Sequence, residues 1–204
     1  MPGALITKGG PTIPTMKRSL FLFLLALLLG HLLPGKAVGQ AKYFTRTGTI
    51  SFFSSTPLED IKAENRQVAS VLDLNKGELA FSVLMKSFSF PKALMQEHFN
   101  ENFVESTKYP KSNFKGTIQN PEGINPAQDG TYPVTVTGDL TLHGVTRPFK
   151  TDGTIEVREG KVFAQSAFEL APEDFKIRIP ALVRDKIAKS IRVRVEVTYE
   201  PYLE

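Results

Sequence analysis

Two histidines, His98 and His143, are the side chains beyond residue 39 best suited to proton transfer or metal binding. Glu97 precedes His98, but no second histidine follows at the i, i+4 spacing of a metal-binding helix. The chain contains no cysteine, which removes thiol catalysis, disulfides and cysteine-ligated metals. It also lacks a phosphate-binding loop, a dinucleotide fingerprint and a nucleophile elbow. The sequence therefore predicts a protein that is not an enzyme and that holds no metal and no cofactor.

The apolar side chains point to a different function, which is to bind a long apolar ligand and remove it from water. Two of the 15 phenylalanines precede residue 40, which leaves 13 in the rest of the chain, and tryptophan is absent. Burial of one such side chain stabilises a protein by about 1.5–3 kcal/mol. Any single phenylalanine is more simply a core residue, but the set is large enough to line a cavity. We expect an apolar lumen lined by Phe52, Phe81, Val83, Phe88, Phe99, Phe114, Val134, Val136, Leu140 and Phe149.

The segments that must position these side chains alternate between apolar and polar residues, as β-strands do. Two short helices are also expected, at residues 91–102 and 180–188, because Pro91 and Pro180 suit a first helical position. The parity of apolar residues changes between Met85 and Phe88, which predicts a bulge or a bend. Residues 58–66 are interpreted as a polar connection. The predicted strands are residues 42–54, 67–74, 78–90, 112–119, 131–142, 145–157, 161–170 and 190–199.

Eight strands with mostly short connections and no βαβ alternation argue against a parallel sheet. They fit an all-β fold, either a closed antiparallel barrel or a two-sheet sandwich. An eight-stranded barrel has an interior that is filled by side chains or holds one small ligand.

The most regular stretch is the predicted hairpin at residues 131–149. His143-Gly144 is a two-residue loop in which glycine can adopt the positive φ of a type I′ turn. That loop pairs Leu142 with Val145, Leu140 with Arg147 and Gly138 with Phe149. A glycine opposite a phenylalanine leaves room for an aromatic ring on the sheet face.

The hairpin segment GDLTLHGVTRPF resembles the signature hairpin of the YceI-like family of exported lipid-binding proteins. Three further blocks resemble the family in the same order: Phe81 to Glu101, Lys108 to Ile118 and Leu170 to Ile191. The resemblance implies an eight-stranded antiparallel, lipocalin-like barrel with two short helices. It also implies that a polyisoprenoid, an isoprenoid quinone or a fatty-acid-like chain occupies an internal channel.

The N-terminal 39 residues have the pattern of a signal peptide. Met16-Lys17-Arg18 forms a basic region, residues 20–33 are almost entirely apolar, and Ala37-Val38-Gly39 supplies small residues at a cleavage site. The apolar run is short for a membrane span, although an uncleaved anchor is the alternative. We expect a signal peptide at residues 1–39 and a barrel domain at residues 40–204. Residues 1–15 are interpreted as the result of a start codon assigned too far upstream.

The positive charge of the chain comes from that same segment. It holds Lys8, Lys17, Arg18 and Lys36 and no acidic residue, so 21 of the 25 basic residues remain against 21 acidic ones. A neutral domain does not have the concentrated basic surface that binds nucleic acid. Without cysteine the chain also cannot carry the lipid anchor of a lipoprotein. We expect a soluble exported protein, periplasmic or secreted, whose oligomeric state the sequence does not determine.

The expected function is sequestration or transport of an amphiphilic lipid in the barrel lumen. Arg147 shares the inward parity of the hairpin, and a buried unpaired cation is costly, so it should be paired or lie at the rim. It is either an exposed guanidinium or, together with His143, a contact for a polar head group at the barrel entrance. Two other functions stay open: an enzyme that acts on a lipid inside the same barrel, and a ligand-free barrel with a filled core that binds a partner protein.

Overall fold

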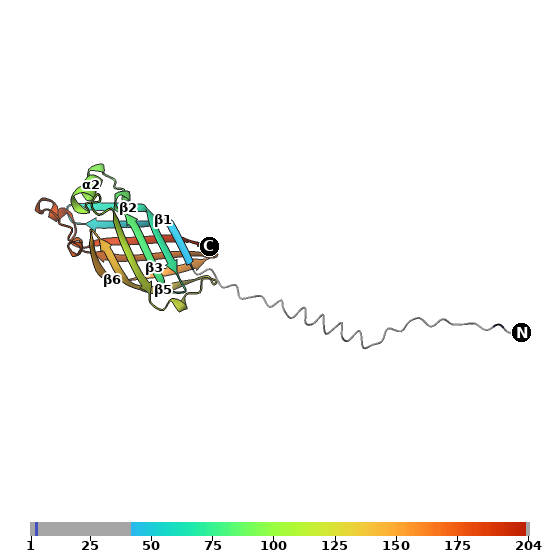
Figure 1. The fold of residues 1–204 in the computed structure, drawn as a ribbon. Coiled ribbons are helices and arrows are strands. Elements are labelled where there is room, and N and C mark those ends of the chain that lie inside the picture. The colour runs from blue at the N-terminus through green and yellow to red at the C-terminus, as the bar shows by residue number, and fades with distance from the viewer. Residues whose placement is uncertain (1–2, 4–41, 203–204) are drawn as a thin grey trace. The chain divides into compact units, whose positions relative to one another are not determined.

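The computed structural model describes Gly3 and residues 42–202. The predicted signal peptide and its cleavage site therefore lie, Gly3 apart, outside the described residues. Eight antiparallel strands follow one another around a closed barrel, and β1 pairs with β8 to complete it (Figure 1). The predicted eight-stranded barrel is confirmed. The strands are β1 Lys42–Ser55, β2 Asp60–Asp73, β3 Glu78–Leu84, β4 Lys111–Ile118, β5 Gly130–Leu142, β6 Val145–Arg158, β7 Lys161–Leu170 and β8 Ile191–Pro201.

Helical turns occupy the connections between strands. The predicted helix at residues 91–102 is α2, Ala93–His98, which continues as a π-helical turn, η2, Phe99–Phe103. The second predicted helix is a 3-10 helix, η5, Ala181–Lys186. Three shorter 3-10 turns complete the set: η1 Met85–Ser87, η3 Pro121–Gly123 and η4 Pro172–Phe175.

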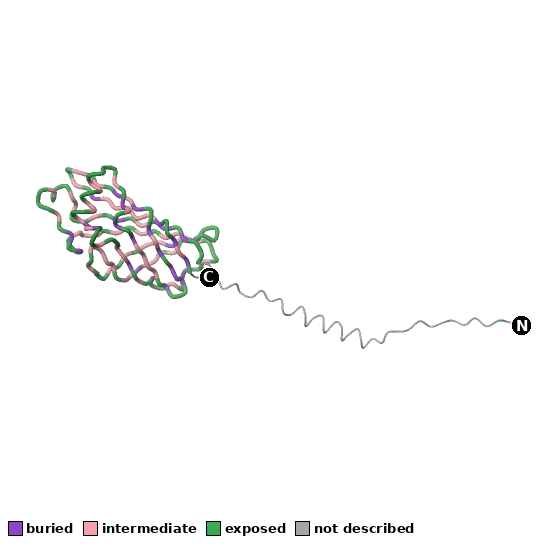
Figure 2. Tube along the Cα trace, turned by 45° about the horizontal axis from the view of Figure 1, so that its top comes forward, coloured by how far each residue is buried: buried purple, intermediate pink, exposed green. Residues whose placement is uncertain are grey.

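The connections divide between the two ends of the barrel. We call one end the mouth; it comprises residues 56–59, 85–110, 143–144 and 171–190, and it includes α2 and η5 (Figure 1). We call the opposite end the floor; it comprises residues 74–77, 119–129 and 159–160. Figure 2 shows exposed residues gathered in these connections and buried residues distributed along the strands.

Strand β2 starts earlier than the sequence predicted. Residues 60–66, interpreted as a polar connection, pair with β1 over the whole stretch from Asn65 to Asp60. Asn65 is fully buried. Because this inward position is polar, the segment does not show the alternation of apolar and polar residues that would predict a strand. The amide Nδ2 of Asn65 donates to the carbonyl oxygen of Leu84 at 2.8 Å, and its Oδ1 accepts from the backbone N–H of Gln67 at 2.8 Å. These bonds satisfy a buried polar side chain that no alternation rule anticipates.

The change of parity after Met85 marks the end of a strand. Strand β3 stops at Leu84, and η1 turns the chain so that Met85 and Phe88 are both buried. The predicted bend is confirmed, although the strand predicted to reach residue 90 is six residues shorter.

The central hairpin has the predicted register. Leu142 pairs with Val145, Leu140 with Arg147 and Gly138 with Phe149. Both turn residues have positive φ, 51° at His143 and 71° at Gly144, as a type I′ turn requires.

The ring that uses the space over the glycines belongs to Phe114, not to Phe149. Gly138 pairs with Gly116 of β4 as well as with Phe149 of β6. A Cβ on Gly116 would lie 2.5 Å from Cζ of Phe114, whereas a Cβ on Gly138 would meet the backbone of β4 at Lys115. Gly138 therefore allows two strands to approach closely, and its neighbour Gly116 accommodates the ring.

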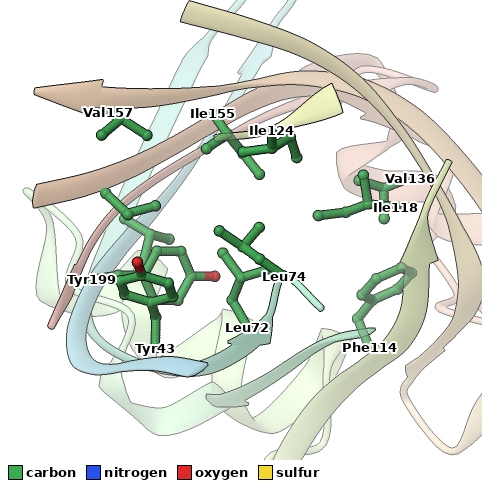
Figure 3. Close-up of a cluster of buried hydrophobic side chains, with 12 residues drawn as sticks. Tyr43, Leu72, Leu74, Phe114, Ile118, Ile124, Val136, Ile155, Val157 and Tyr199 are labelled. Atoms are coloured by element: carbon green, nitrogen blue, oxygen red, sulfur yellow. The ribbon is translucent and has the colours of Figure 1, made fainter. Parts of the chain in front are cut away.

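A cluster of buried apolar side chains closes the floor. Figure 3 shows them pointing into the barrel from the surrounding strands. Ile124, which follows η3, is folded inward and is 8% exposed, so the connection between β4 and β5 acts as a plug. The cluster consists of Tyr43, Leu72, Leu74, Phe114, Ile118, Ile124, Val136, Ile155, Val157, Val162, Val197 and Tyr199.

Tyr199 gives this floor a dependence on pH. Its hydroxyl lies 2.7 Å from Oγ of Ser70, and since Ser70 donates to the carbonyl oxygen of Ala80, Tyr199 is the donor of that contact. Burial disfavours the phenolate and raises the pKa of Tyr199 well above its ordinary value, and burial raises the pKa of Tyr43 in the same direction.

We expect the free energy of unfolding to fall as pH rises above about 10, the ordinary pKa of tyrosine. The folded protein holds these protons more tightly than the unfolded chain, so the stabilisation is complete below that pH and is lost above it. Tyr199→Phe should reduce the alkaline fall and cost about 1 kcal/mol at neutral pH through the lost hydrogen bond. Urea denaturation across a pH series measures both effects. An alkaline slope identical to that of the wild type would contradict the assignment.

Candidate functional site

An apolar cavity of about 590 Å³ runs along the inside of the barrel. This volume lies within the range of about 300–1,000 Å³ typical of small-molecule sites. Its lining extends from Leu72 and Tyr199 at the floor to Leu94 and Lys186 at the mouth. The filled barrel that the sequence left open is therefore wrong. All ten residues predicted to line the lumen do line it: Phe52, Phe81, Val83, Phe88, Phe99, Phe114, Val134, Val136, Leu140 and Phe149.

Four phenylalanine rings form the part of the wall beneath α2. Phe99 lies at the end of α2, and its ring centroid is 5.5 Å from Phe52, 5.6 Å from Phe88 and 5.1 Å from Phe90. Phe52 in turn contacts Phe88 and Phe90 at 5.5 and 5.8 Å. Aromatic pairs at these separations add about 0.5–1.5 kcal/mol beyond the burial of their area. The rings therefore attach α2 to the barrel.

A second row of rings crosses the barrel where β6 and β7 separate. The pairing of β6 with β7 ends at Gly153 and Ser166. Towards the mouth, Phe149 of β6 packs edge-on against Phe168 of β7 at 4.8 Å, and Phe149 also lies 6.2 Å from Phe114. Side-chain contacts thus replace backbone pairing at this seam.

Two hydroxyl groups line the cavity at the same seam. Ser166 donates to the carbonyl oxygen of Asp152 at 2.7 Å, and Oγ1 of Thr151 lies 3.1 Å from Oγ of Ser166. They are polar atoms in a mostly apolar wall, and their hydrogen bonds within the barrel satisfy them without a ligand.

Several lining residues were missed from the sequence. Val193 and Val195 on β8 belong to the clearest alternation in the chain, so their inward parity could have identified them. Phe175 and Ile177 could not be found in this way, because they belong to the irregular segment around η4. Both are nevertheless buried, at 3% and 9% exposure, and they line the cavity.

His143 and Arg147 hold the segments of the mouth together and are not part of the cavity lining. Nδ1 of His143 donates to the carbonyl oxygen of Phe175 at 3.0 Å, and its Nε2 lies 2.8 Å from Oε2 of Glu105. Its ring also packs against Tyr109, with the centroids 4.6 Å apart. The hairpin tip is thereby tied to the segment after η2 and to η4.

Arg147 makes a second tie to η4. Its Nη1 donates to the backbone carbonyl of Asp174 at 3.0 Å and lies 3.2 Å from the carboxylate of the same residue. The side chain is 51% exposed, so the structure agrees with the interpretation of an exposed guanidinium and gives it an acidic partner. Surface ion pairs of this kind typically contribute about 0–1 kcal/mol.

We expect His143→Ala to lower the free energy of unfolding by about 1–3 kcal/mol, because it leaves the Phe175 carbonyl without its donor and removes the contacts with Glu105 and Tyr109. Lipid binding should weaken a few-fold, since Phe175 lines the cavity and its segment loses an anchor. Chemical denaturation and ligand titration measure the two effects. His98→Ala is the control for stability, because His98 is exposed. Equal stability of the two variants would contradict the role given to His143.

The titratable groups that line the cavity lie mainly at the mouth. Glu59, Lys92, His98 and Lys186 belong to its connections, and Oε1 of Glu59 accepts from Nζ of Lys92 at 3.3 Å. Tyr199 is the fifth and lies at the floor. Within residues 42–202 the structure brings no three histidine, aspartate or glutamate side chains together in a metal-binding arrangement.

A family model described as the YceI-like domain matches residues 36–199, which is most of the chain. The chain belongs to the YceI-like family. This confirms the resemblance of the central hairpin and of the three further blocks.

The YceI-like fold also connects the chain to solved structures. A polyisoprenoid binding domain from Saccharophagus degradans, implicated in plant cell wall breakdown, aligns with a TM-score of 0.70 at 16% identity and covers 80% of this chain and 99% of that one. BcnA of Burkholderia cenocepacia aligns with a TM-score of 0.63 at 14% identity, covering 75% and 96% of the two chains. These TM-scores show a shared fold.

A UPF0312 protein of Pseudomonas fluorescens shares more sequence over a shorter stretch. It is 39% identical over 62 residues, and the match spans 30% of this chain and 30% of that protein. No helix in the described part of this YceI-like chain is long and apolar enough to cross a membrane.

Proposed function

We propose that this YceI-like domain binds one amphiphilic lipid in its lumen and holds it for sequestration or transport. The observation that carries the proposal is the cavity itself, which has mostly apolar walls, is closed by Ile124 and its neighbours at the floor, and has exposed lining residues at the mouth. A lipid tail gains about 0.8 kcal/mol for each CH₂ group that leaves water for such a site. The elongated cavity suits a single chain with its head group at the mouth.

The proposed ligand is a polyisoprenoid, an isoprenoid quinone or a fatty-acid-like chain. The description of the Saccharophagus domain as polyisoprenoid binding supports the first of these. We also propose that residues 1–39 direct export and that the mature protein works in the periplasm or is secreted. The basic region, the apolar run and the small residues before Gln40 support this part of the proposal.

Binding without chemistry is proposed because most of the side chains that line the cavity are phenylalanine, valine, leucine and isoleucine, which transfer no protons. Glu59, the one carboxylate that lines the cavity within residues 42–202, is paired with Lys92 at the mouth. The alternative, an enzyme that acts on a lipid in this barrel, would need one of the lining groups to hold a reacting proton.

Native mass spectrometry of the protein purified from its own host tests the proposal, because a bound lipid is weighed directly. We expect one lipid per chain, and its mass should be unchanged after long incubation. A time-dependent product that disappears with His98→Ala, a change at a histidine that lines the cavity, would establish the enzyme instead. Loss of a catalytic group typically costs about 10²–10⁴ in rate. A protein that stays empty and takes up none of the three lipid classes would contradict the lumen as a binding site.

A further inference from the structure

Three large apolar side chains are exposed at the mouth. Leu58 is 67% exposed, Leu94 is 61% exposed and Leu182 is 93% exposed. They lie in three separate segments: the connection between β1 and β2, the helix α2 and the 3-10 helix η5. Leu94 lines the cavity from α2 and is nevertheless largely exposed. Exposed apolar groups that gather in one region commonly mark an interaction surface.

The segment that carries Leu182 is strongly basic. Residues 176–189 contain five basic side chains and one acidic one, Asp185. All five basic side chains are exposed, and within residues 42–202 none of them has an ion-pair partner, unlike Lys92 and Arg147. They are Lys176, Arg178, Arg184, Lys186 and Lys189. Three of the other acidic residues of the mouth, Glu59, Glu105 and Asp174, already contact Lys92, His143 and Arg147. The remaining ones are Glu97, Glu101 and Glu173.

The cavity reaches the surface beside these same residues. Lys92, Leu94, His98 and Lys186 line the cavity and are also exposed, and they belong to α2, to the residue preceding it, and to η5. Figure 1 shows α2 and the red segment that precedes β8 at the same end of the barrel. The part of the lumen lining that reaches the surface at the mouth thus includes an exposed leucine and two exposed lysines.

We propose that the mouth docks on an anionic lipid bilayer, with Leu58, Leu94 and Leu182 inserted among the head groups. The basic residues of the segment 176–189 then lie against lipid phosphates, as juxtamembrane lysines and arginines do. Apolar insertion combined with electrostatic attraction is how interfacial segments bind membranes. The docked mouth faces the bilayer, so a lipid moves between bilayer and lumen without crossing water.

A bilayer fits this surface better than a folded partner does. The three leucines project from separate short connections, and a fluid interface can receive each of them at its own depth. The excess of basic side chains without acidic partners matches the phosphate layer of an anionic membrane. The reason for docking rests on the proposed lipid-carrying function, whereas the docking itself depends only on the mouth.

Flotation with vesicles tests the inference. The protein expressed from the full sequence is mixed with vesicles of phosphatidylglycerol and phosphatidylcholine, or with vesicles of phosphatidylcholine alone. We expect binding to the mixed vesicles, weaker binding to the neutral ones, and loss of binding in about 1 M salt, where the Debye length is about 3 Å. Residues 1–39 are common to all variants, so differences between variants report on the mouth.

Two changes at the mouth should weaken vesicle binding. Leu182→Ser should do so about ten-fold or more, since it removes an inserted leucine. The pair Arg184→Ala and Lys186→Ala should do so about 25-fold, at about five-fold per basic side chain near an anionic surface. The matched control is the pair Lys76→Ala and Lys161→Ala, which should bind like the wild type. Lys76 belongs to the floor and Lys161 begins β7 directly beside it, and both side chains are exposed.

Leu182 does not line the cavity, so Leu182→Ser separates docking from lipid binding. Native mass spectrometry should find the same bound lipid in this variant as in the wild type. A loaded protein that ignores anionic vesicles, or one that floats equally well with the mouth and floor variants, would overturn the docking surface and leave the lumen proposal standing. An empty protein that still floats and loses flotation with Leu182→Ser would support docking while contradicting the lumen proposal.

Discussion

We expect Val136→Trp to lower the affinity for a long-chain lipid more than a hundred-fold while the barrel remains folded. Val136 is 7% exposed and lines the cavity near the floor, between Ile118 on β4 and Thr151 on β6. An indole at this position fills the bore and excludes the end of the tail. A tail that loses four CH₂ groups of burial loses about 3 kcal/mol, which corresponds to more than a hundred-fold in affinity.

The matched control is Thr137→Trp, which places the same side chain on the next residue of β5. Thr137 has the outward parity and does not line the cavity, so this variant should bind lipid normally. Overpacking at Val136 should cost about 1–3 kcal/mol of stability, and thermal denaturation shows whether the fold survives. Titration with a fluorescent long-chain probe measures affinity. Normal binding by a folded Val136→Trp variant would place the ligand somewhere other than the lumen.

The inner wall was predictable where a short turn fixes the register of two strands. Once His143 and Gly144 are recognised as a two-residue turn, the side chains of β5 and β6 must alternate in a fixed order. Val134, Val136, Leu140 and Phe149 then share one face, and the structure places all of them in the cavity lining. The alternation of β8 likewise indicates which of its side chains face the lumen, although none of them was among the predicted lining residues.

The mouth was not predictable, because its contacts join segments that are distant along the chain. The Glu105 carboxylate that meets His143 lies 38 residues before it, and the carbonyl of Phe175 lies 32 residues after it. Neither segment has an alternating or helical pattern of apolar residues from which the direction of its side chains could be predicted. The start of β2 was predicted wrongly for a related reason. Asparagine is usually exposed, and the burial of Asn65 follows only once its hydrogen-bond partners are known.

Phe99→Ala should accelerate lipid exchange about ten- to a hundred-fold, because the ring of Phe99, at the C-cap of α2, packs the helix against Phe52 of β1 and against the segment that precedes the helix. It contacts Phe52, Phe88 and Phe90, whereas Leu94 on the same helix is largely exposed. Each aromatic pair contributes about 0.5–1.5 kcal/mol, and about 1.4 kcal/mol corresponds to ten-fold. A helix that is held less tightly opens more often, as lids that control ligand release do.

Stopped-flow measurements with a fluorescent long-chain probe distinguish a lid from a simple contact. If α2 must open for entry and exit, Phe99→Ala raises the association and dissociation rate constants together. Phe114→Ala is the control: it removes a ring from the lumen wall on β4, well inside the barrel, and should raise the dissociation rate constant alone. Glu97→Ala, an exposed change on α2 itself, should alter neither. An unchanged association rate constant in Phe99→Ala would make α2 a fixed part of the wall, and the lipid would then have to enter past a helix that does not move.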